Sequence, residues 1–315
     1  MHIVYLGSGE FGIDCLNVLK DCEHSLEVIV TGPARRAGRG RGKRATAVCC
    51  WATANKMPFI ETENVNSPEI IKKISSYEPD LIVVIAFAQK IGNELINLPS
   101  KGAINVHSSL LPKYRGAAPI NWVIVNGERE TGISIITLAE KMDAGNIAGQ
   151  VKTEIQPDET AGQLHDRLAR MAGGLLLETI NKIADGTVVY TPQDDSKATL
   201  APKIKKSEGF LDFRDSAGSI RNKILGFWPW PGASVLYESK QSGKRERVVI
   251  AMAKVVKSSS SLPVGTLDED LNIVCGEDVL AVVKIKPAGG TLMDFKDFVN
   301  GRRVCPGDIF IKIEE

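Results

Sequence analysis

In the first 190 residues, short apolar runs alternate with longer segments whose apolar positions have helical spacing. The run at 81–86 is apolar throughout, which is typical of a parallel strand covered on both faces. Five other apolar runs predict strands, namely 2–6, 26–30, 59–60, 103–106 and 131–138. Helical spacing predicts helices near 11–19, 46–55, 68–76, 117–126 and 160–184. This alternation predicts an α/β fold with a Rossmann-like, doubly wound parallel sheet.

The pattern changes after about residue 189. Residues 190–208 combine turn-forming residues with several lysines and predict a linker. Beyond the linker, one helix near 216–226 precedes short strand-like runs that Gly, Pro and Ser separate. These runs are 233–237, 247–253, 273–274, 279–285 and 309–313. We therefore predict an α/β domain over 1–189 and a second, smaller domain over 209–315, folded as an OB-like β-barrel.

Composition places the chain among globular proteins. Apolar residues make up 43% and charged residues 24% of the 315 residues, and no apolar run is long enough for a membrane helix. The first residues lack the pattern of a signal peptide. The six cysteines form no CxxC pair and are too sparse for a disulfide scaffold. We therefore expect a cytoplasmic protein that is not bound to a membrane.

The net charge is only +1, so any affinity for nucleic acid must come from local clustering. Six of the ten residues in 35–44 are basic, and three glycines between them disfavour a helix. The segment could be a solvated, mobile loop, or it could contact a phosphate backbone. Its position after a strand, where α/β sheets bind ligands, favours the second interpretation. The candidate contacts are Arg35, Arg36, Arg39, Arg41, Lys43 and Arg44.

Residues 7–12 match the dinucleotide-binding pattern G-x-G-x-x-G between a predicted strand and a predicted helix. The acidic residue that usually binds the ribose is absent, because the second strand ends in Thr31-Gly32-Pro33. Arg35 and Arg36 could instead hold the phosphate of NADP. The simpler interpretation is a tight turn from strand to helix that lines a site.

The segment 105–119 contains the most informative polar residues. If a strand ends at His107, Asn105 and His107 lie on the same face of it. Asp143 lies in a predicted turn, two residues before Gly145. An Asn that donates to an oxyanion, a His that carries charge and an Asp that orients it could form an acyl-transfer site. From composition alone, structural roles for the His and the Asp remain open. No pair of histidines has the spacing of metal ligands, so we predict no metal.

These residues carry a family resemblance. The sequence resembles the formyltransferase family that uses 10-formyltetrahydrofolate. The resemblance lies in three motifs, namely Asn105-Val106-His107 through Pro119, Gly132-x-Ser134 and Met142-Asp143-x-Gly145. The resemblance covers essentially the whole chain and includes 227–231 and 286–298. It implies a Rossmann-like catalytic domain (1–189), a linker (190–208) and an OB-like tRNA-binding domain (209–315). It also implies that the protein uses neither NAD nor a metal.

The resemblance also implies roles for individual residues. Asn105, His107 and Asp143 correspond to the catalytic set. The folate is expected to contact two segments, Ser109, Leu110, Leu111 and Pro112 in one and Phe87, Ala88, Gln89, Lys90 and Ile91 in the other. Linker lysines are expected to contact tRNA, namely Lys203, Lys205 and Lys206. The chain departs from the family at Ser108, where Gly is common, and at Phe87-Ala88, where Tyr-Gly is common.

The implied reaction is transfer of the formyl group from 10-formyltetrahydrofolate, the co-substrate, to the α-amine of methionine on initiator tRNA. The product, N-formylmethionyl-tRNA, serves translation initiation in protein biosynthesis. An α-amine has a pKa of about 7.7–8.0, so part of it is neutral and nucleophilic near neutral pH. Two alternatives are a formyltransferase for a sugar nucleotide or glycinamide ribonucleotide, and a non-catalytic RNA-binding protein. The second domain and the basic segment favour tRNA over the small substrates, and we expect a monomer.

Overall fold

The computed structural model describes residues 1–36 and 42–314, and residue contacts define two compact units. Unit 1 consists of Met1–Gly116, Thr131–Thr153 and His165–Leu200. Unit 2 consists of Ala117–Glu130, Glu154–Leu164 and Ala201–Glu315. Neither unit is a single stretch of sequence, because two short middle segments of the chain belong to unit 2.

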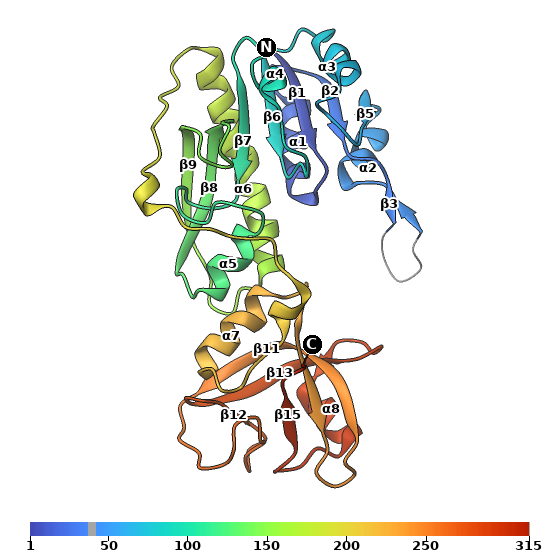
Figure 1. The fold of residues 1–315 in the computed structure, drawn as a ribbon, viewed down its shortest axis with the longest axis vertical. Helices are drawn as coiled ribbons and strands as arrows, with labels where there is room; N and C mark the ends of the chain where they lie inside the picture. The colour runs from blue at the N-terminus through green and yellow to red at the C-terminus, as the bar shows by residue number, and fades with distance from the viewer. Residues whose placement is uncertain (37–41, 315) are drawn as a thin grey trace. The chain divides into compact units, whose positions relative to one another are not determined.

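Unit 1 contains a seven-stranded sheet in the order β5-β2-β1-β6-β7-β8-β9 (Figure 1). The strands are β1 (His2–Gly7), β2 (Ser25–Thr31), β5 (Phe59–Glu61), β6 (Leu81–Ile85), β7 (Ala103–His107), β8 (Glu130–Thr137) and β9 (Ile147–Glu154). The first five strands in this order are parallel. This confirms the predicted Rossmann-like fold.

The sheet is mixed rather than wholly parallel, which corrects one detail of the prediction. β8 pairs with β7 in the antiparallel direction, with His107 opposite Ser134. A parallel neighbour needs a connection that crosses back over the sheet, whereas an antiparallel strand re-enters at the edge where its neighbour ends. The chain between β7 and β8 takes the second route. β9, the strand next to β8, was not predicted from the sequence.

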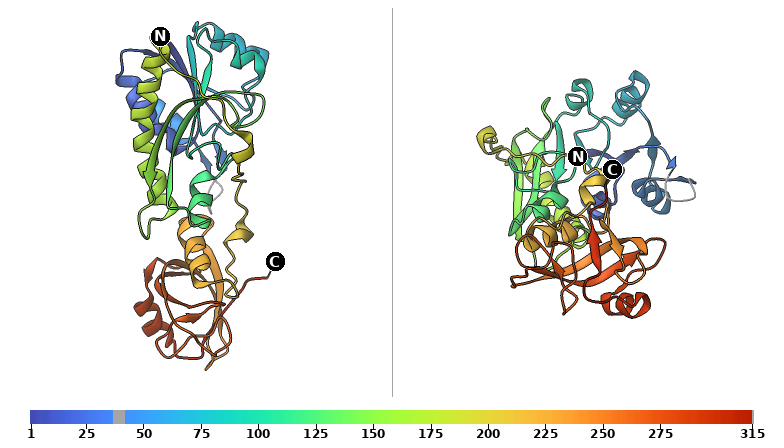
Figure 2. Two further views of the ribbon diagram at one scale, coloured as in Figure 1. Left: turned by 90° about the vertical axis from the view of Figure 1, so that its left-hand side faces the viewer. Right: turned by 60° about the horizontal axis from the view of Figure 1, so that its bottom comes forward.

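Helices cover both faces of this sheet (Figure 2). One face carries α1 (Ile13–Asp21), α2 (Ala47–Ala54) and the part of α6 (Ala161–Ala184) that lies in unit 1. Trp51 of α2 donates a 2.7 Å hydrogen bond to Asn17 of α1, and Gly173 lets α6 approach Val18 closely. The other face carries α3 (Pro68–Ser75) and α4 (Asn93–Ile96). Within residues 1–36 and 42–314, none of the helices combines the length and the hydrophobicity that a membrane-spanning helix needs.

The turn that follows β1 explains the glycines of the G-x-G-x-x-G pattern. Tyr5 is fully buried, and burial raises the pKa of its hydroxyl well above the ordinary value. A Cβ atom at Gly7 would lie 2.5 Å from this hydroxyl, and one at Gly12 only 1.9 Å. Both glycines therefore make room for Tyr5 beneath the turn, which supports the tight-turn interpretation.

We expect Gly12→Ala to destabilise the protein by about 1–3 kcal/mol, because the added methyl group overlaps the Tyr5 hydroxyl. The backbone of Gly12, with φ −83°, is one that alanine adopts readily, so the clash alone accounts for the cost. Urea unfolding of wild type, Gly12→Ala, Tyr5→Phe and the double variant measures the effect. The cost of Gly12→Ala should be smaller in the Tyr5→Phe background. Equal costs in both backgrounds would contradict this explanation.

Unit 2 is built around a nearly closed antiparallel barrel with the strand order β12-β13-β11-β10-β15, and β14 pairs with β13. The strands are β10 (Ala233–Glu238), β11 (Arg245–Val256), β12 (Ile273–Val274), β13 (Val279–Pro287), β14 (Met293–Asp294) and β15 (Ile309–Ile311). Its helices are α5 (Pro119–Val125), α7 (Ala217–Gly226) and α8 (Phe295–Arg302). Aromatic side chains such as Tyr237, Phe298 and Phe310 form its core. This architecture confirms the predicted second β-domain.

Candidate active site

The candidate catalytic residues lie at the carboxyl edge of the sheet in unit 1. The chain adds β2 and β5 on one side of β1, and it adds β6 and β7 on the other. The strand order therefore reverses at β1 and β6, where open α/β sheets bind their ligands. β7 ends at His107 next to this point.

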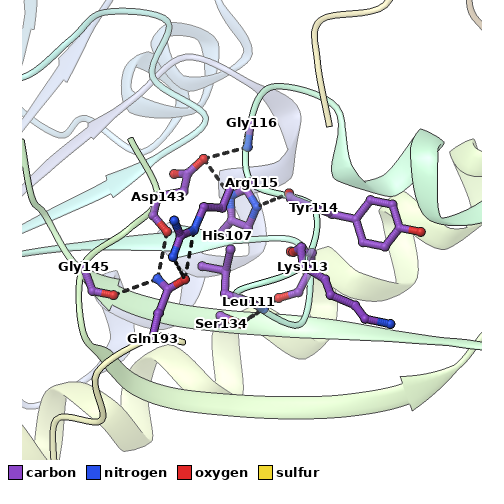
Figure 3. Close-up of polar contacts among 11 residues, drawn as sticks. His107, Leu111, Lys113, Tyr114, Arg115, Gly116, Ser134, Asp143, Gly145 and Gln193 are labelled. Atoms are coloured by element: carbon purple, nitrogen blue, oxygen red, sulfur yellow. Dashed lines mark hydrogen bonds and ion pairs between the residues drawn. The ribbon is translucent and has the colours of Figure 1, made fainter. Parts of the chain in front are cut away.

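His107 is nearly buried and held from two sides (Figure 3). Its Nε2 atom lies 2.9 Å from the carbonyl oxygen of Tyr114. Because a carbonyl only accepts hydrogen bonds, Nε2 must carry a proton. The Nδ1 atom faces the Oδ2 atom of Asp143 at 3.7 Å, which is an ion-pair distance rather than a hydrogen bond. The ring therefore has a fixed orientation, with one nitrogen donating and the other facing a carboxylate.

Asp143 lies in the turn between β8 and β9 and has a left-handed backbone with φ +52°. Its Oδ2 atom accepts a 2.9 Å hydrogen bond from the backbone N–H of Gly116. Two residues later, a Cβ atom at Gly145 would lie 1.8 Å from the carbonyl oxygen of Thr137, so the turn requires glycine there. The carboxylate is thus presented to His107 by a turn that few sequences can form.

Asn105 lies two residues before His107 on β7, so the two side chains share one face of the strand. The residue is half-buried. Within the described chain, its side-chain amide makes no hydrogen bond, so both the N–H groups and the oxygen are open to a ligand. The structure thus places Asn105 and His107 on one strand end and brings Asp143 to His107 from a distant turn.

The segment that follows His107 is mostly used for its own packing. Ser109 is fully buried, and its hydroxyl donates to a backbone carbonyl of the same loop at 2.7 Å. Ser134 of β8 donates to the carbonyl of Ser109 and accepts from the N–H of Leu111, which is also buried. Leu110 and Pro112 are half-buried and offer more surface. Of the four predicted folate contacts here, these two are the most accessible.

Gln89 joins the loop after β6 to the neighbouring segment 62–65 by hydrogen bonds. The Gln89 amide donates to one backbone carbonyl of the segment 62–65 and accepts from one of its N–H groups, both at 2.8 Å. Its polar atoms are therefore engaged within the protein. The other predicted contacts of this loop alternate between exposed Ala88 and Lys90 and half-buried Phe87 and Ile91.

Two residues near the site were not given a role by the sequence. Arg115 is 4% exposed, and its guanidinium lies 2.7 Å from the carboxylate of Asp195. This contact, followed by one from Lys141, lowers the pKa of Asp195. Gln193 lies between Arg115 and the Asp143 turn and bonds to both (Figure 3). Arg115 belongs to the quoted pattern, but nothing in the turn-rich segment 190–208 marks Gln193.

The basic residues lie in two separate places in the chain. Residues 35–36 and 43–44 pair as the short antiparallel strands β3 (Arg35–Arg36) and β4 (Lys43–Arg44), where the sequence predicted an irregular loop. Arg35, Lys43 and Arg44 are exposed, whereas Arg39 and Arg41 lie outside the described residues. In unit 2, the three predicted lysines, Lys203, Lys205 and Lys206, are all exposed. No group of His, Cys, Asp and Glu in the described ranges could hold a metal ion.

Comparisons with known proteins agree with this geometry. Residues 1–180 match the family model described as formyl transferase, and residues 203–303 match the model of its C-terminal domain. The methionyl-tRNA formyltransferase of Caldanaerobacter subterraneus subsp. tengcongensis is 35% identical over 98% of this chain and 99% of its own. The enzyme of the same name from Halalkalibacterium halodurans is 38% identical over 96% of this chain and 95% of its own.

A solved structure is similar in fold. The N-formyltransferase of Helicobacter canadensis, in complex with folinic acid and dTDP-3-aminofucose, has a TM-score of 0.62 and 17% identity. The similarity covers 89% of this chain and 98% of that one, so it includes parts of both units. Since two family models match most of the sequence and full-length relatives share about a third of it, the chain belongs to the formyl transferase family.

Proposed function

We propose that this protein is a methionyl-tRNA formyltransferase. It transfers the formyl group of 10-formyltetrahydrofolate to the α-amino group of methionyl initiator tRNA and so produces N-formylmethionyl-tRNA. One observation carries this proposal. At the carboxyl edge of the sheet, the accessible amide of Asn105 lies on the same strand face as the imidazole of His107, which Tyr114 and the carboxylate of Asp143 contact. The full-length relatives named for this reaction support the choice of substrate.

In the proposed mechanism, Asn105 donates a hydrogen bond to the oxyanion that forms when the neutral amine attacks the formyl carbon. Its amide suits this role because it has no other partner among the described residues. His107, with Nε2–H held by Tyr114, supplies positive charge next to the same oxyanion when it is protonated. Both groups act on charge that develops only in the transition state, so they raise kcat more than they improve binding.

Asp143 orients His107 and receives the proton that the attacking amine loses, directly or through water. One new N–C bond forms, and the bond between the formyl carbon and N10 of the folate breaks. The amine proton finally resides on that N10 nitrogen, so atoms and charge balance. The carboxylate is suited to pass this proton on because Gly116 N–H fixes its orientation.

The binding residues remain part of the proposal. The folate contacts the segment 109–112, mainly through Leu110 and Pro112, and the loop 87–91. The tRNA contacts the basic residues of 35–44 and the lysines at 203–206. In this proposal, residues 1–189 form the catalytic domain, residues 190–208 form the linker, and residues 209–315 form the tRNA-binding domain. The protein acts as a monomer in the cytoplasm.

Formylation assays with purified protein test the function. We expect rapid formylation of methionyl initiator tRNA and none of a sugar nucleotide or of glycinamide ribonucleotide under the same conditions. Mass spectrometry of the aminoacyl group identifies the product. Formylation of either small substrate without formylation of the tRNA would contradict the proposal.

We also expect no saturable binding of NAD or NADP. The place where a ribose-binding acid would lie is occupied by Thr31, whose hydroxyl is 2.8 Å from that of Thr46 and 3.3 Å from that of Ser8. Thermal-shift titration measures binding, because a ligand that binds only the folded state raises Tm. A reduced folate is the positive control. Micromolar affinity for either dinucleotide would overturn this expectation.

A further inference from the structure

Residues 191–200, here called the strap, are hydrogen-bonded to the two segments that support His107 and Asp143. These two residues are here called the catalytic pair. At one end, Thr191 exchanges two backbone hydrogen bonds with Ile147, just after the Asp143 turn. At the other end, Thr199 accepts from the backbone N–H groups of Tyr114 and Arg115, each at 2.9 Å. Tyr114 supplies the carbonyl that holds His107. The strap therefore connects the support of His107 with the support of Asp143.

Gln193 is the residue of the strap that reaches the Asp143 turn (Figure 3). Its Nε2 atom donates to the carbonyl oxygens of Asp143 at 2.8 Å and Gly145 at 2.7 Å. Its Oε1 atom accepts from the Nη2 and Nε atoms of Arg115, at 2.8 and 3.1 Å. A flipped amide would set its oxygen against two carbonyls and its N–H groups against a guanidinium, so the orientation is unambiguous.

The Asp143 turn needs such support. A left-handed backbone at a non-glycine residue persists only where the surroundings hold it. Gln193 binds two carbonyls within this turn, and it is held in turn by Arg115, which is buried and paired with Asp195. These contacts run from Asp195 through Arg115 and Gln193 to the backbone of the residue that faces His107.

We propose that Gln193 is a positioning residue for the catalytic pair: it fixes the Asp143 turn at the distance and angle from which the carboxylate serves His107. The inference rests on the proposed function. Gln193 acts through Asp143 and not on the substrate, because both N–H groups of its amide are already used inside the protein. His107 and Asp143 are 3.7 Å apart, and the rate is expected to be sensitive to a displacement of the Asp143 turn. A misplacement of a catalytic group by about 1 Å can cost about 10²-fold in rate.

Two variants test the role. Gln193→Met keeps the length of the side chain and removes all of its hydrogen bonds. Gln193→Glu keeps an acceptor for Arg115 but sets a carboxylate against the two carbonyls. We expect each to lower kcat about 10–100-fold and to leave the affinity for folate and the KM for tRNA nearly unchanged. Gln156→Met, at an exposed glutamine of unit 2, is the matched control and should keep wild-type kinetics.

A double variant separates positioning from a general loss of stability. If Gln193 acts through Asp143, Gln193→Met costs little further turnover in an Asp143→Ala background, because the group it positions is already gone. Equal losses in both backgrounds, or wild-type kcat in either folded single variant, would overturn the inference. An inactive wild type would instead reject the proposed function. Should Gln193→Met fail to fold, the same cycle with Gln193→Glu decides the question.

Discussion

Asn105→Ala is expected to lower kcat about 10²–10³-fold, the usual effect of removing one hydrogen-bond donor to an oxyanion. The Asn105 amide lies on the same strand face as His107 and has no other partner in the described chain, so it is free for this role. Folate affinity should change much less, because the oxyanion exists only after the amine has attacked. Steady-state formylation of methionyl-tRNA and folate titration measure the two effects.

His107→Ala and Asp143→Ala should each lose at least as much turnover. In the proposed mechanism, the imidazole carries the charge beside the oxyanion, and the carboxylate, which faces it at 3.7 Å, both orients it and accepts the amine proton. Asn97→Ala, at an exposed asparagine of unit 1, provides a control of the same type. If Asp143→Ala retained near-wild-type turnover, the assignment of the catalytic set would be wrong.

The site was partly predictable because some of its geometry is local. The strand period of two places Asn105 and His107 on one face without knowledge of the fold, and glycine two residues after Asp143 marks a turn. The contact between His107 and Asp143 joins two such local features. It was inferred from residue types and from the family resemblance, and the structure now gives its distance.

Gln193 could not be predicted in the same way. Its partners at 115, 143 and 145 are far from it in sequence, and only the folded chain brings them together. The family resemblance likewise implied a folate contact for the whole segment 109–112 and did not separate buried Ser109 and Leu111 from the more accessible Leu110 and Pro112.

Several elements were not predicted from the sequence, and β9 and α8 show that their local signals are weak. β9 is an edge strand that begins Ile-Ala-Gly, and α8 is eight residues long with a glycine in its last turn. Elements with such weak local signals depend on tertiary packing more than on intrinsic propensity. In α8, this packing comes from Phe295 and Phe298, which join the core of unit 2. The antiparallel direction of β8 was also not encoded locally, because an apolar run has no direction.

Removal of positive charge from the segment 35–44 is expected to weaken tRNA binding and to flatten its dependence on salt. The variant is Arg39→Ala/Arg41→Ala. Basic residues that contact phosphates release counter-ions, so log Kd changes linearly with log salt concentration, with a slope of about 0.9 for each contact. Loss of two contacts should therefore lower the slope by about 1.8. Wild-type affinity should fall about 12-fold more than that of the variant between 50 and 200 mM salt.

The control must remove equal charge elsewhere in unit 1. Lys72→Ala/Lys73→Ala does so at two exposed lysines in the last turn of α3. This variant should keep the wild-type slope, because a net charge of +1 gives the whole molecule little attraction for RNA and the effect must come from position. Folate affinity should stay unchanged in both variants, since the proposed folate contacts lie in the loops after β6 and β7. Filter binding at several salt concentrations measures the slopes. Unchanged tRNA affinity of Arg39→Ala/Arg41→Ala at every salt concentration would remove this segment from the tRNA interface, and with it the charge argument for tRNA over a sugar nucleotide.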